Sequence, residues 1–507
     1  MGTPLGQFVY FNTSPWYGAR LALQLLGSSV QTVTPGRVTT AKHDAALLLS
    51  FLSAREYPAL FEVLRHARVP LYARDRGASD PLVIVGGGAC MNPEPMADFV
   101  DVVCVGDGEA FLTGLPQALS YPTRAARLDA VRELPGAYLP GERTFTYEGG
   151  ILVRDVSGDT SNILPAVNTT WYPPPPAAKG QSPEIELARG CRGTCFFCTI
   201  AWTTPYRERP QDQAETDLTA EALAFFAPNI GGVSYYADIA HRRGKATKGD
   251  VRVDDYLRLP MPQPGDGQAQ RVTFGIEGIT PRLRRLLGKR ISDEILGQLF
   301  QRLITARVQH AQLYFIRGVP GESQADWDAF ERWIEQDVHM LLDAGIPVEI
   351  QLTPLTRQPH TPLQWVAHPY NRESEARTKA LVDRARKAKA RDAGSLLYVT
   401  PSRREASWLV DVALNCGSRQ TGKFLQILDR GFLGSLHADA GVGFGTAKVR
   451  WALVASGIDP DLLLADWPVE AVLPWSHLQP LGEAGERHRR SAYEYITRAM
   501  RAGVAGD

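Results

Sequence analysis

Residues 184–200 read EIELARGCRGTCFFCTI and join a strand-like run to a cysteine-rich loop. The run leads into Gly190, and thiols follow at Cys191, Cys195 and Cys198. Thiolates are common ligands of iron–sulfur clusters, and three of them leave one iron of a four-iron cluster without a protein ligand. We therefore predict a [4Fe-4S] cluster on this loop, whose open iron can chelate the amine and carboxylate of a small molecule.

Two other interpretations of the three cysteines are a structural zinc site and buried packing thiols. Zinc requires a fourth Cys or His at a suitable spacing, and the nearest such residue is His241, far along the chain. The other cysteines, Cys90, Cys104 and Cys416, are scattered and suit small buried side chains. This distribution indicates one metal site in a reducing compartment and not a disulfide framework.

Beyond the cysteine loop, strand-like runs alternate with helical stretches. We expect strands at residues 184–187, 232–236, 272–276, 311–316 and 348–352, and helices that include 215–226 and 293–306. Such β-α units predict a partial (β/α)6 barrel of the TIM type over residues 184–395, with its chemistry at the carboxyl ends of the strands. A charged helix at 371–393 suits a solvated face of this barrel, because acidic residues interrupt the basic ones.

The first 140 residues also alternate between apolar runs and helix-like stretches. The runs lie at 8–11, 45–49, 82–85 and 101–106, which predicts a doubly wound, Rossmann-like α/β domain over residues 1–140. Ligands of such sheets bind beyond the carboxyl ends of the strands. A tight turn is the simpler explanation for any one glycine there, but several such ends together suggest a crevice. The candidate crevice residues are Asn12, Thr13, Ser50, Ser53, Gly86, Gly87, Gly88, Asn92, Gly106, Gly108 and Glu109.

Two segments complete the expected organisation. Residues 141–183 lose periodicity and contain four consecutive prolines at 173–176, so we expect a linker with at most a short hairpin. Residues 396–507 have their own apolar content, including four tryptophans. We expect a small α-rich carboxyl-terminal domain that serves as a cap or substrate domain.

Composition narrows the classes of partner. The 507 residues include 55 basic and 55 acidic side chains, so no excess charge is available to attract nucleic acid or an anionic membrane. No apolar run approaches the ~18 residues that a membrane span requires, and the amino terminus lacks the order of a secretory signal. We expect a cytoplasmic protein that binds no membrane, and the charge balance disfavours a nucleic-acid partner.

With Phe197 directly before Cys198, the cysteine loop resembles the signature of the radical S-adenosylmethionine (radical SAM) superfamily. Pro81–Leu112, Val272–Ile291, Leu313–Ser323 and Gln351–Trp365 resemble its cobalamin-binding-domain subgroup. The resemblance implies a [4Fe-4S] cluster on the three cysteines, S-adenosylmethionine on the open iron and cobalamin in the first domain. It implies these S-adenosylmethionine contacts: Phe197, Tyr236, Asp238, Glu277, Arg317 and Gly318.

Some motifs of the family are missing. The usual Gly-Gly-Glu is absent from residues 235–238, and no Asp-x-His-x-x-Gly offers a histidine to cobalt, since His43 and His66 have other surroundings. The lower face of a bound cobalamin is therefore expected to be unligated or to face a side chain other than histidine. Alternatively, the domain keeps the fold without the cofactor. His360, in Pro-His-Thr-Pro, is expected to order its loop.

The resemblance implies an enzyme, and first a cobalamin-dependent methyltransferase. In this hypothesis a 5′-deoxyadenosyl radical takes a hydrogen atom from an unactivated carbon, and methylcobalamin supplies the methyl group. A second hypothesis is a rearrangement, oxidation or cyclisation, with cobalamin redox-active or absent. A third is a binding protein without turnover. The expected partners are a small-molecule or peptide substrate and a reductant such as flavodoxin or ferredoxin.

Overall fold

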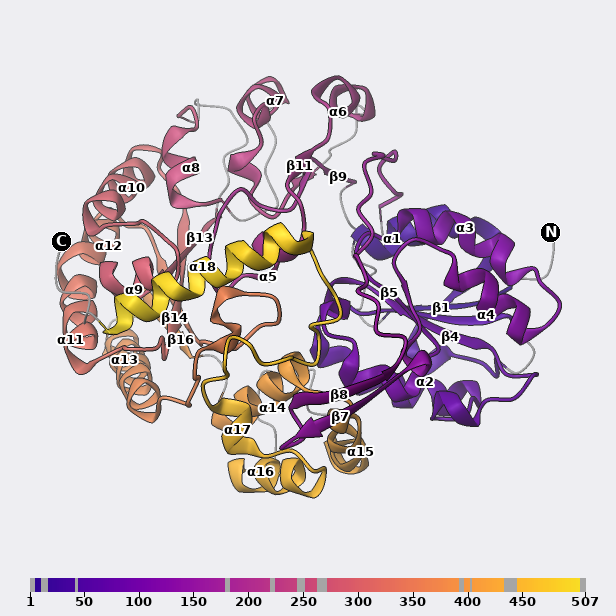
Figure 1. Cartoon of the computed structure of the whole chain (residues 1–507). Helices are drawn as coiled ribbons and strands as arrows, with labels where there is room; N and C mark the ends of the chain where they lie inside the picture. The colour runs from indigo at the N-terminus through magenta and orange to yellow at the C-terminus, as the bar shows by residue number, and fades with distance from the viewer. Residues whose placement is uncertain are drawn as a thin grey trace. The chain divides into compact units, whose positions relative to one another are not determined.

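The structure is a computed structural model in two compact units (Figure 1). It describes residues 5–10, 17–41, 44–177, 183–218, 224–243, 251–261, 271–391, 396–401, 404–432 and 445–501. Unit 1 comprises Met1–Lys179, Arg357–His360 and Glu405–His488. Unit 2 comprises Gly180–Thr356, Thr361–Arg404 and Arg489–Asp507.

A six-stranded sheet forms the centre of unit 1. Its strands are β1 (Gly6–Tyr10), β2 (Val30–Val33), β3 (Ala46–Ser50), β4 (Leu82–Gly86), β5 (Val102–Cys104) and β6 (Ala137–Tyr138). They lie in the order β2-β1-β3-β4-β5-β6, and all are parallel except β6. The order 2-1-3-4-5 is a doubly wound arrangement whose direction changes between β1 and β3. The predicted doubly wound sheet is therefore present.

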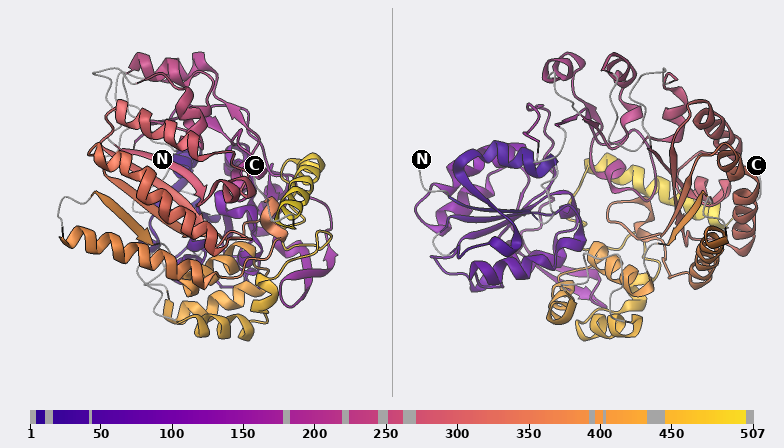
Figure 2. Two further views of the ribbon diagram at one scale, coloured as in Figure 1. Left: turned by 90° about the vertical axis from the view of Figure 1, so that its left-hand side faces the viewer. Right: turned by 180° about the vertical axis from the view of Figure 1, so that it is seen from behind.

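Helices cover both faces of this sheet, as Figure 1 and the rear view in Figure 2 show. One face carries α1 (Tyr17–Leu26), α3 (Glu109–Leu119) and α4 (Arg124–Arg132), and the other carries α2 (Ala59–Ala67). Side chains alternate along a strand, so Leu48 and Ile84 pack with α1 and α3 while their neighbours point to α2. Burial on both faces explains why these strands read as continuous apolar runs.

The rest of unit 1 comes from segments that we expected to lie elsewhere. The expected linker holds a hairpin of β7 (Arg143–Glu148) and β8 (Leu152–Gly158). Four helices of the expected carboxyl-terminal domain also belong to unit 1. They are α14 (Glu405–Cys416), α15 (Gln420–Phe432), α16 (Thr446–Ala455) and α17 (Pro460–Leu464). Instead of a separate domain, they pack within unit 1, because their apolar side chains are buried there: a Cβ on Gly422 would lie 2.6 Å from the ring of Phe99.

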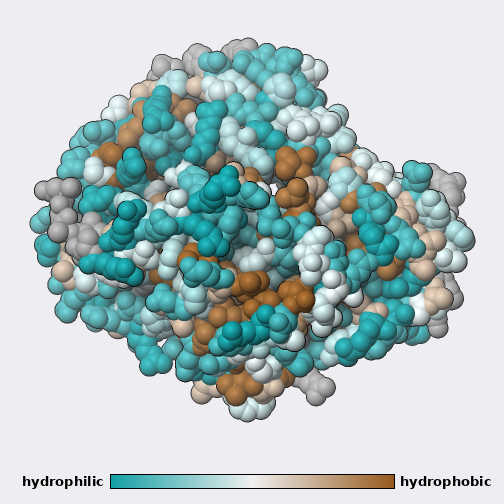
Figure 3. All heavy atoms as spheres, viewed as in Figure 1, coloured by the Kyte–Doolittle hydropathy of each residue, from teal (hydrophilic) through white to brown (hydrophobic). Residues whose placement is uncertain are grey.

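Helix α16 nevertheless leaves apolar surface exposed. Trp451 and Val454 are 61% and 62% exposed. Apolar side chains gather over this helix at the bottom of the face drawn in Figure 3. Of the four tryptophans of this region, Trp408, Trp467 and Trp475 are thus buried in the core, whereas Trp451 is exposed.

Unit 2 contains two parallel sheets. The larger has β13 (Arg271–Gly278), β14 (His310–Arg317), β15 (Val348–Pro354) and β16 (Leu397–Pro401) in that order. The smaller pairs β9 (Glu184–Glu186) with β12 (Ala224–Phe226), and an antiparallel hairpin joins β10 (Ala188–Arg189) to β11 (Arg207–Glu208). The strands of the partial barrel are therefore parallel as expected, whereas its closure stays a prediction.

Helices connect these strands. They are α5 (Thr199–Thr203), α6 (Gln211–Asp217), α7 (Tyr236–Arg243), α8 (Val253–Arg258), α9 (Pro281–Leu286), α10 (Asp293–Thr305), α11 (Gln324–Trp333), α12 (His339–Asp343) and α13 (Arg372–Arg391). The last helix, α18 (Gly482–Arg501), follows all the strands, and its residues from Arg489 onward belong to unit 2. Within the described ranges, no helix combines the length and the apolarity that a bilayer crossing requires.

The second strand of this region lies earlier than we expected. The prediction of a strand at 232–236 and a helix through 226 is wrong, because β12 occupies Ala224–Phe226 and Tyr236 begins α7. Val233 and Tyr235 are buried in the same hydrophobic cluster as Phe225, but from a turn. A short apolar run in the sequence does not show whether the segment is a strand or another buried segment. Residues 224–226 form the strand because they pair with β9.

Candidate functional site

The cysteine loop begins directly after β10. Gly190 has φ +70°, and a Cβ there would lie 2.6 Å from the carbonyl oxygen of Thr204, so only glycine fits this approach. The amide of Cys198 donates to the carbonyl of Cys195 at 3.2 Å, which makes a tight turn. The indole of Trp202 donates to the same carbonyl at 2.9 Å and fixes the turn on α5.

The three thiols of the loop influence one another electrostatically. Burial raises the pKa of Cys195 and that of Cys198, and the neighbouring thiols raise both further. Cys191 contributes to each shift, so every pair among the three is within electrostatic reach. The amide of Gly193 donates to the sulfur of Cys191 at 3.2 Å.

Two cations approach Cys195. A guanidinium nitrogen of Arg252, Nη1, lies 3.4 Å from the Cys195 sulfur and donates to it. Arg252 and Lys289 both act to lower the pKa of this thiol, against the larger effect of burial. Cations beside a thiol favour the thiolate, which is the form that binds iron. Sequence analysis singled out neither residue: Arg252 lies outside the quoted segments, and Lys289 lies within Val272–Ile291 but was given no role.

The end of strand β13 lies against the same loop. A Cβ on Gly288 would lie 2.5 Å from the carbonyl oxygen of Thr194, and the amide of Phe196 donates to the carbonyl of Leu287 at 3.0 Å. Glu277 has φ +78° at a β-bulge, a conformation that costs about 1–3 kcal/mol and is concentrated at functional sites. Its carboxylate pairs with Lys289 at 3.1 Å. Glu277 stands at the carboxyl end of β13. The structure thus brings Glu277 beside the cysteine loop.

The end of strand β14 holds two further predicted residues. Arg317 is buried, and its Nη2 donates to the hydroxyl of Tyr370 at 3.0 Å. Gly318 has φ +70°, and its amide donates to the carboxylate of Glu322 at 2.7 Å. The indole of Trp327 donates to the other oxygen of Glu322 at 2.8 Å. Glu322, which sequence analysis did not single out, therefore orders the turn after β14.

The remaining predicted contacts are in different settings. Phe197 is half-buried and packs against the core of the β13–β15 sheet. Tyr236 belongs to another hydrophobic cluster, where its ring meets Phe225 edge-on at 6.4 Å between centroids. Asp238 is exposed in the first turn of α7. The role of these three side chains at S-adenosylmethionine stays a prediction.

A carboxylate from strand β11 lies beside residues 230–235, in place of the acid expected within residues 235–238. Glu208 accepts hydrogen bonds from the amide of Ser234 and from Nη2 of Arg192, both at 3.0 Å. The hydroxyl of Tyr206 also donates to Glu208. Sequence analysis missed this residue, because it searched for an acid within 235–238.

In unit 1 some of the predicted crevice residues lie at or just after the carboxyl ends of β3 and β4. Ser50 and Gly86 end adjacent strands β3 and β4 and are register partners. Ser53 is exposed and caps the 3-10 turn Ala54–Glu56, and Gly88 is exposed near it. Asn12 and Thr13 lie outside the described residues.

The other crevice residues have partners within the chain. A Cβ on Gly87 would lie 2.3 Å from the carbonyl oxygen of Phe51, and one on Gly106 would lie 2.4 Å from that of Ala166. Close approach of the backbone therefore requires both glycines. This agrees with the explanation that each glycine serves a tight turn. Gly108 precedes α3, and Glu109 begins it with a buried side chain.

Asn92 and His360 order loops of unit 1. The Asn92 amide donates to the carbonyls of Asn415 and Gly417, each at 2.9 Å. His360 has its Nε2 2.9 Å from the carbonyl oxygen of Met91. The expectation that His360 orders its loop agrees with this contact.

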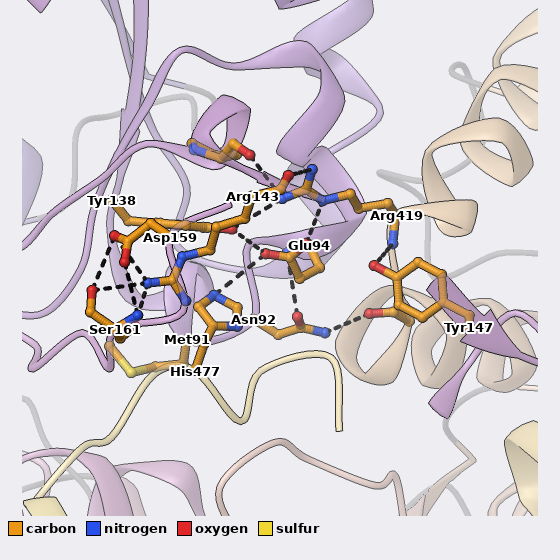
Figure 4. Close-up of polar contacts among 12 residues, drawn as sticks. Met91, Asn92, Glu94, Tyr138, Arg143, Tyr147, Asp159, Ser161, Arg419 and His477 are labelled. Atoms are coloured by element: carbon orange, nitrogen blue, oxygen red, sulfur yellow. Dashed lines mark hydrogen bonds and ion pairs between the residues drawn. The ribbon is translucent and has the colours of Figure 1, made fainter. Parts of the chain in front are cut away.

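A buried polar network follows Asn92 (Figure 4). The carboxylate of Glu94 is fully buried and accepts from the Tyr138 hydroxyl at 2.6 Å and from Nε of Arg419 at 2.7 Å. His477 lies 3.5 Å from the same carboxylate, but burial lowers its pKa to about 4, so the ring is neutral at pH 7. This network joins the segment after β4 to β6 and α15.

Comparison with known proteins finds a family match in the amino-terminal part of the chain. Residues 28–140 match the family described as “Radical SAM proteins, N-terminal”. This part of the chain is therefore similar to radical SAM proteins. The similarity implies a [4Fe-4S] cluster and S-adenosylmethionine.

Two other comparisons give more distant similarities. An uncharacterized protein of Methanocaldococcus jannaschii is 24% identical over 300 residues, which are 55% of the chain and 61% of that protein. The chain thus spans about three fifths of the length of this curated relative. Two structures of the cobalamin-dependent S-adenosylmethionine radical enzyme OxsB, one with aqua-cobalamin and one apo, are 13% identical with a TM-score of 0.44. They cover 98% of the chain, which covers 80% and 79% of theirs.

The cysteine loop suits a cluster better than a zinc ion. Zinc would gather four ligands around one ion, and the described residues, the three cysteines included, contain no group of three or more His, Cys, Asp or Glu placed to hold one. A four-iron cluster instead takes its thiolates at separate irons, which spreads them. A guanidinium donor also lies beside one of the three sulfurs.

Proposed function

We propose that the chain is a cobalamin-dependent radical SAM enzyme that methylates an unactivated carbon of a small molecule or peptide. The observation that carries the proposal is the cysteine loop, in which the thiol of Cys195 senses the charge of the strained Glu277 at the end of β13. When bound, the cluster supplies the electron that cleaves S-adenosylmethionine, and cobalamin carries the methyl group.

The residues of unit 2 have separate tasks in this proposal. Cys191, Cys195 and Cys198 hold three irons. Lys289 fixes the Glu277 carboxylate, which is placed to accept hydrogen bonds from the ribose or ammonium of S-adenosylmethionine. Phe197 covers part of the apolar core and helps to exclude water from the loop.

The sheet of unit 1 supports the cobalamin part of the proposal. Its order changes direction between β1 and β3, and ligands of doubly wound sheets bind at the carboxyl ends there. Ser50 and Gly86 stand at that edge, with the exposed Ser53 and Gly88 beyond them. A domain that retains the fold without cobalamin would fit a rearranging, oxidising or cyclising enzyme instead.

Anaerobic reconstitution with iron and sulfide tests the proposal. The protein is then reduced with dithionite, or with flavodoxin as the proposed natural reductant, in the presence of S-adenosylmethionine and cobalamin. We expect 5′-deoxyadenosine together with S-adenosylhomocysteine, measured by chromatography and mass spectrometry. 5′-Deoxyadenosine alone would favour the non-methylating enzyme. Neither product from a protein loaded with the cluster would contradict the enzymatic proposal.

Variants separate the cysteine loop from the other cysteines. We expect C191A, C195A and C198A each to lose bound iron and all 5′-deoxyadenosine. The matched control is C104A, because burial raises the pKa of Cys104 to about 12 and keeps it a thiol inside unit 1. Iron retained by C198A, or lost equally by C104A, would contradict the assignment.

A further inference from the structure

Arg252 makes a contact that the cluster itself does not require. Its Nη1 donates to the sulfur of Cys195 at 3.4 Å, although the residues are 57 positions apart. Three thiolates are enough to attach the cluster. The Arg252 guanidinium, which contacts one of these sulfurs, therefore affects the cluster through that sulfur.

Neighbouring residues hold the guanidinium in this direction. Asp254 accepts from Nε at 3.1 Å and from Nη2 at 3.3 Å, which leaves Nη1 to face the thiol. The backbone amide of Arg252 donates to the side chain of Asn229 at 3.2 Å, and Asn229 donates to Asp255 at 2.6 Å. Asp254 therefore fixes the guanidinium of Arg252, and Asn229 fixes its backbone.

The cysteine loop also leaves space for Arg252. A Cβ on Gly193 would lie 2.6 Å from Nη1, so any other residue there would push the guanidinium away from the sulfur. Lys289, the second cation near Cys195, is already engaged by Glu277 and by the carbonyl of Gly275. Arg252 is thus the cation that donates directly to a thiol among the described contacts of the loop.

We propose that Arg252 is a positioning residue that raises the reduction potential of the cluster by donating a hydrogen bond to the sulfur of Cys195. The inference rests on the proposed cluster. When the cluster accepts one electron from dithionite or flavodoxin, negative charge on its sulfurs increases, and a donor at one sulfur stabilises the reduced form more than the oxidised form. The arginine thereby makes the cluster easier to reduce.

Redox titration of the reconstituted full chain tests this role. The signal of the reduced cluster is followed by electron paramagnetic resonance against potential. We expect R252M to lower the equilibrium constant for reduction about tenfold, which is 59 mV for a one-electron couple. The matched control is R258M, at the end of the helix α8 that Arg252 precedes, with a side chain that is 75% exposed and pairs with Asp255. We expect R258M to titrate like the wild type.

The outcomes distinguish the inference from the proposed function. A wild-type chain without iron and sulfide overturns the proposed function. An R252M protein that holds its cluster and titrates like the wild type overturns the role of Arg252 alone. If R252M holds no cluster, D254N decides, since it frees the guanidinium without touching a thiol. A lowered potential in D254N supports the inference, and an unchanged one overturns it.

Discussion

Arg419 donates from Nε to the buried carboxylate of Glu94 at 2.7 Å, across 325 positions of sequence (Figure 4). The same guanidinium donates to the carbonyls of Arg143 and Pro140, at 2.8 and 2.9 Å. One side chain directly before α15 therefore ties together the segment after β4 and the start of the β7–β8 hairpin. The pair makes the helical part of unit 1 dependent on the sheet.

Removing Arg419 should destabilise unit 1 strongly. In R419M the Glu94 charge stays buried without its ion-pair partner, which costs about 3–5 kcal/mol of unfolding free energy. Urea unfolding followed by circular dichroism measures the loss. R132M is the control, because Arg132 and Glu142 form an exposed pair that contributes about 0–1 kcal/mol. Equal losses in the two variants would contradict the role of Arg419.

His477 should make stability depend on pH. Burial lowers its pKa to about 4, with help from the cations Arg143 and Arg419 and against Glu94, while the unfolded chain titrates near 6.5. Between pH 4 and pH 6.5 the ring is protonated in the unfolded chain and neutral in the folded chain. The free energy of unfolding therefore falls as the pH falls from 6.5 towards 4. The loss is up to about 1.4 kcal/mol per pH unit.

Replacing the ring tests this dependence. Unfolding free energies of the wild type and H477Q are compared at pH 7.5 and pH 5, and we expect a smaller difference between the two pH values in H477Q. The exposed His66 supplies the control variant H66Q. An identical pH dependence in the wild type and H477Q would show that His477 is not buried as a neutral ring.

Gly288 should be needed to seat the cysteine loop. Its φ of +75° disfavours alanine by about 1–2 kcal/mol, and the added Cβ would also collide with the carbonyl of Thr194. We expect G288A to bind less iron on reconstitution, measured as iron and sulfide per chain. The control is G297A within α10, where a Cβ meets nothing within 4 Å. G297A should keep its iron and gain about 0.5–1 kcal/mol of stability.

Glu277 should contribute to S-adenosylmethionine binding. Hydrogen bonds to a charged group contribute about 1.5–3 kcal/mol, so E277Q should weaken binding roughly tenfold or more while the cluster stays in place. Isothermal titration of the reconstituted protein measures the affinity, and iron content checks the cluster. E349Q on strand β15, whose native carboxylate pairs with Arg271 at 2.8 Å, is the control. Unchanged affinity in E277Q would refute the predicted contact.

The sequence by itself determined the features that depend on short stretches of chain. Runs such as Ala46–Ser50 and Leu82–Gly86 read as parallel strands because both faces of each strand are buried. The spacing of Cys191, Cys195 and Cys198 fixes three thiols on one loop, so the cluster could be predicted without a fold. Where a run was short and ambiguous, as at 224–236, the local pattern failed.

Tertiary structure alone decided which groups act on those stretches. Arg252 reaches Cys195, Lys289 reaches Glu277 and Arg419 reaches Glu94 only after strands and helices have packed. None of these pairs has a sequence spacing that a helix or a strand would impose, and a charged side chain in isolation looks like any solvated one. Burial removes water from such a charge and obliges it to find a partner, and the position of that partner is a property of the fold.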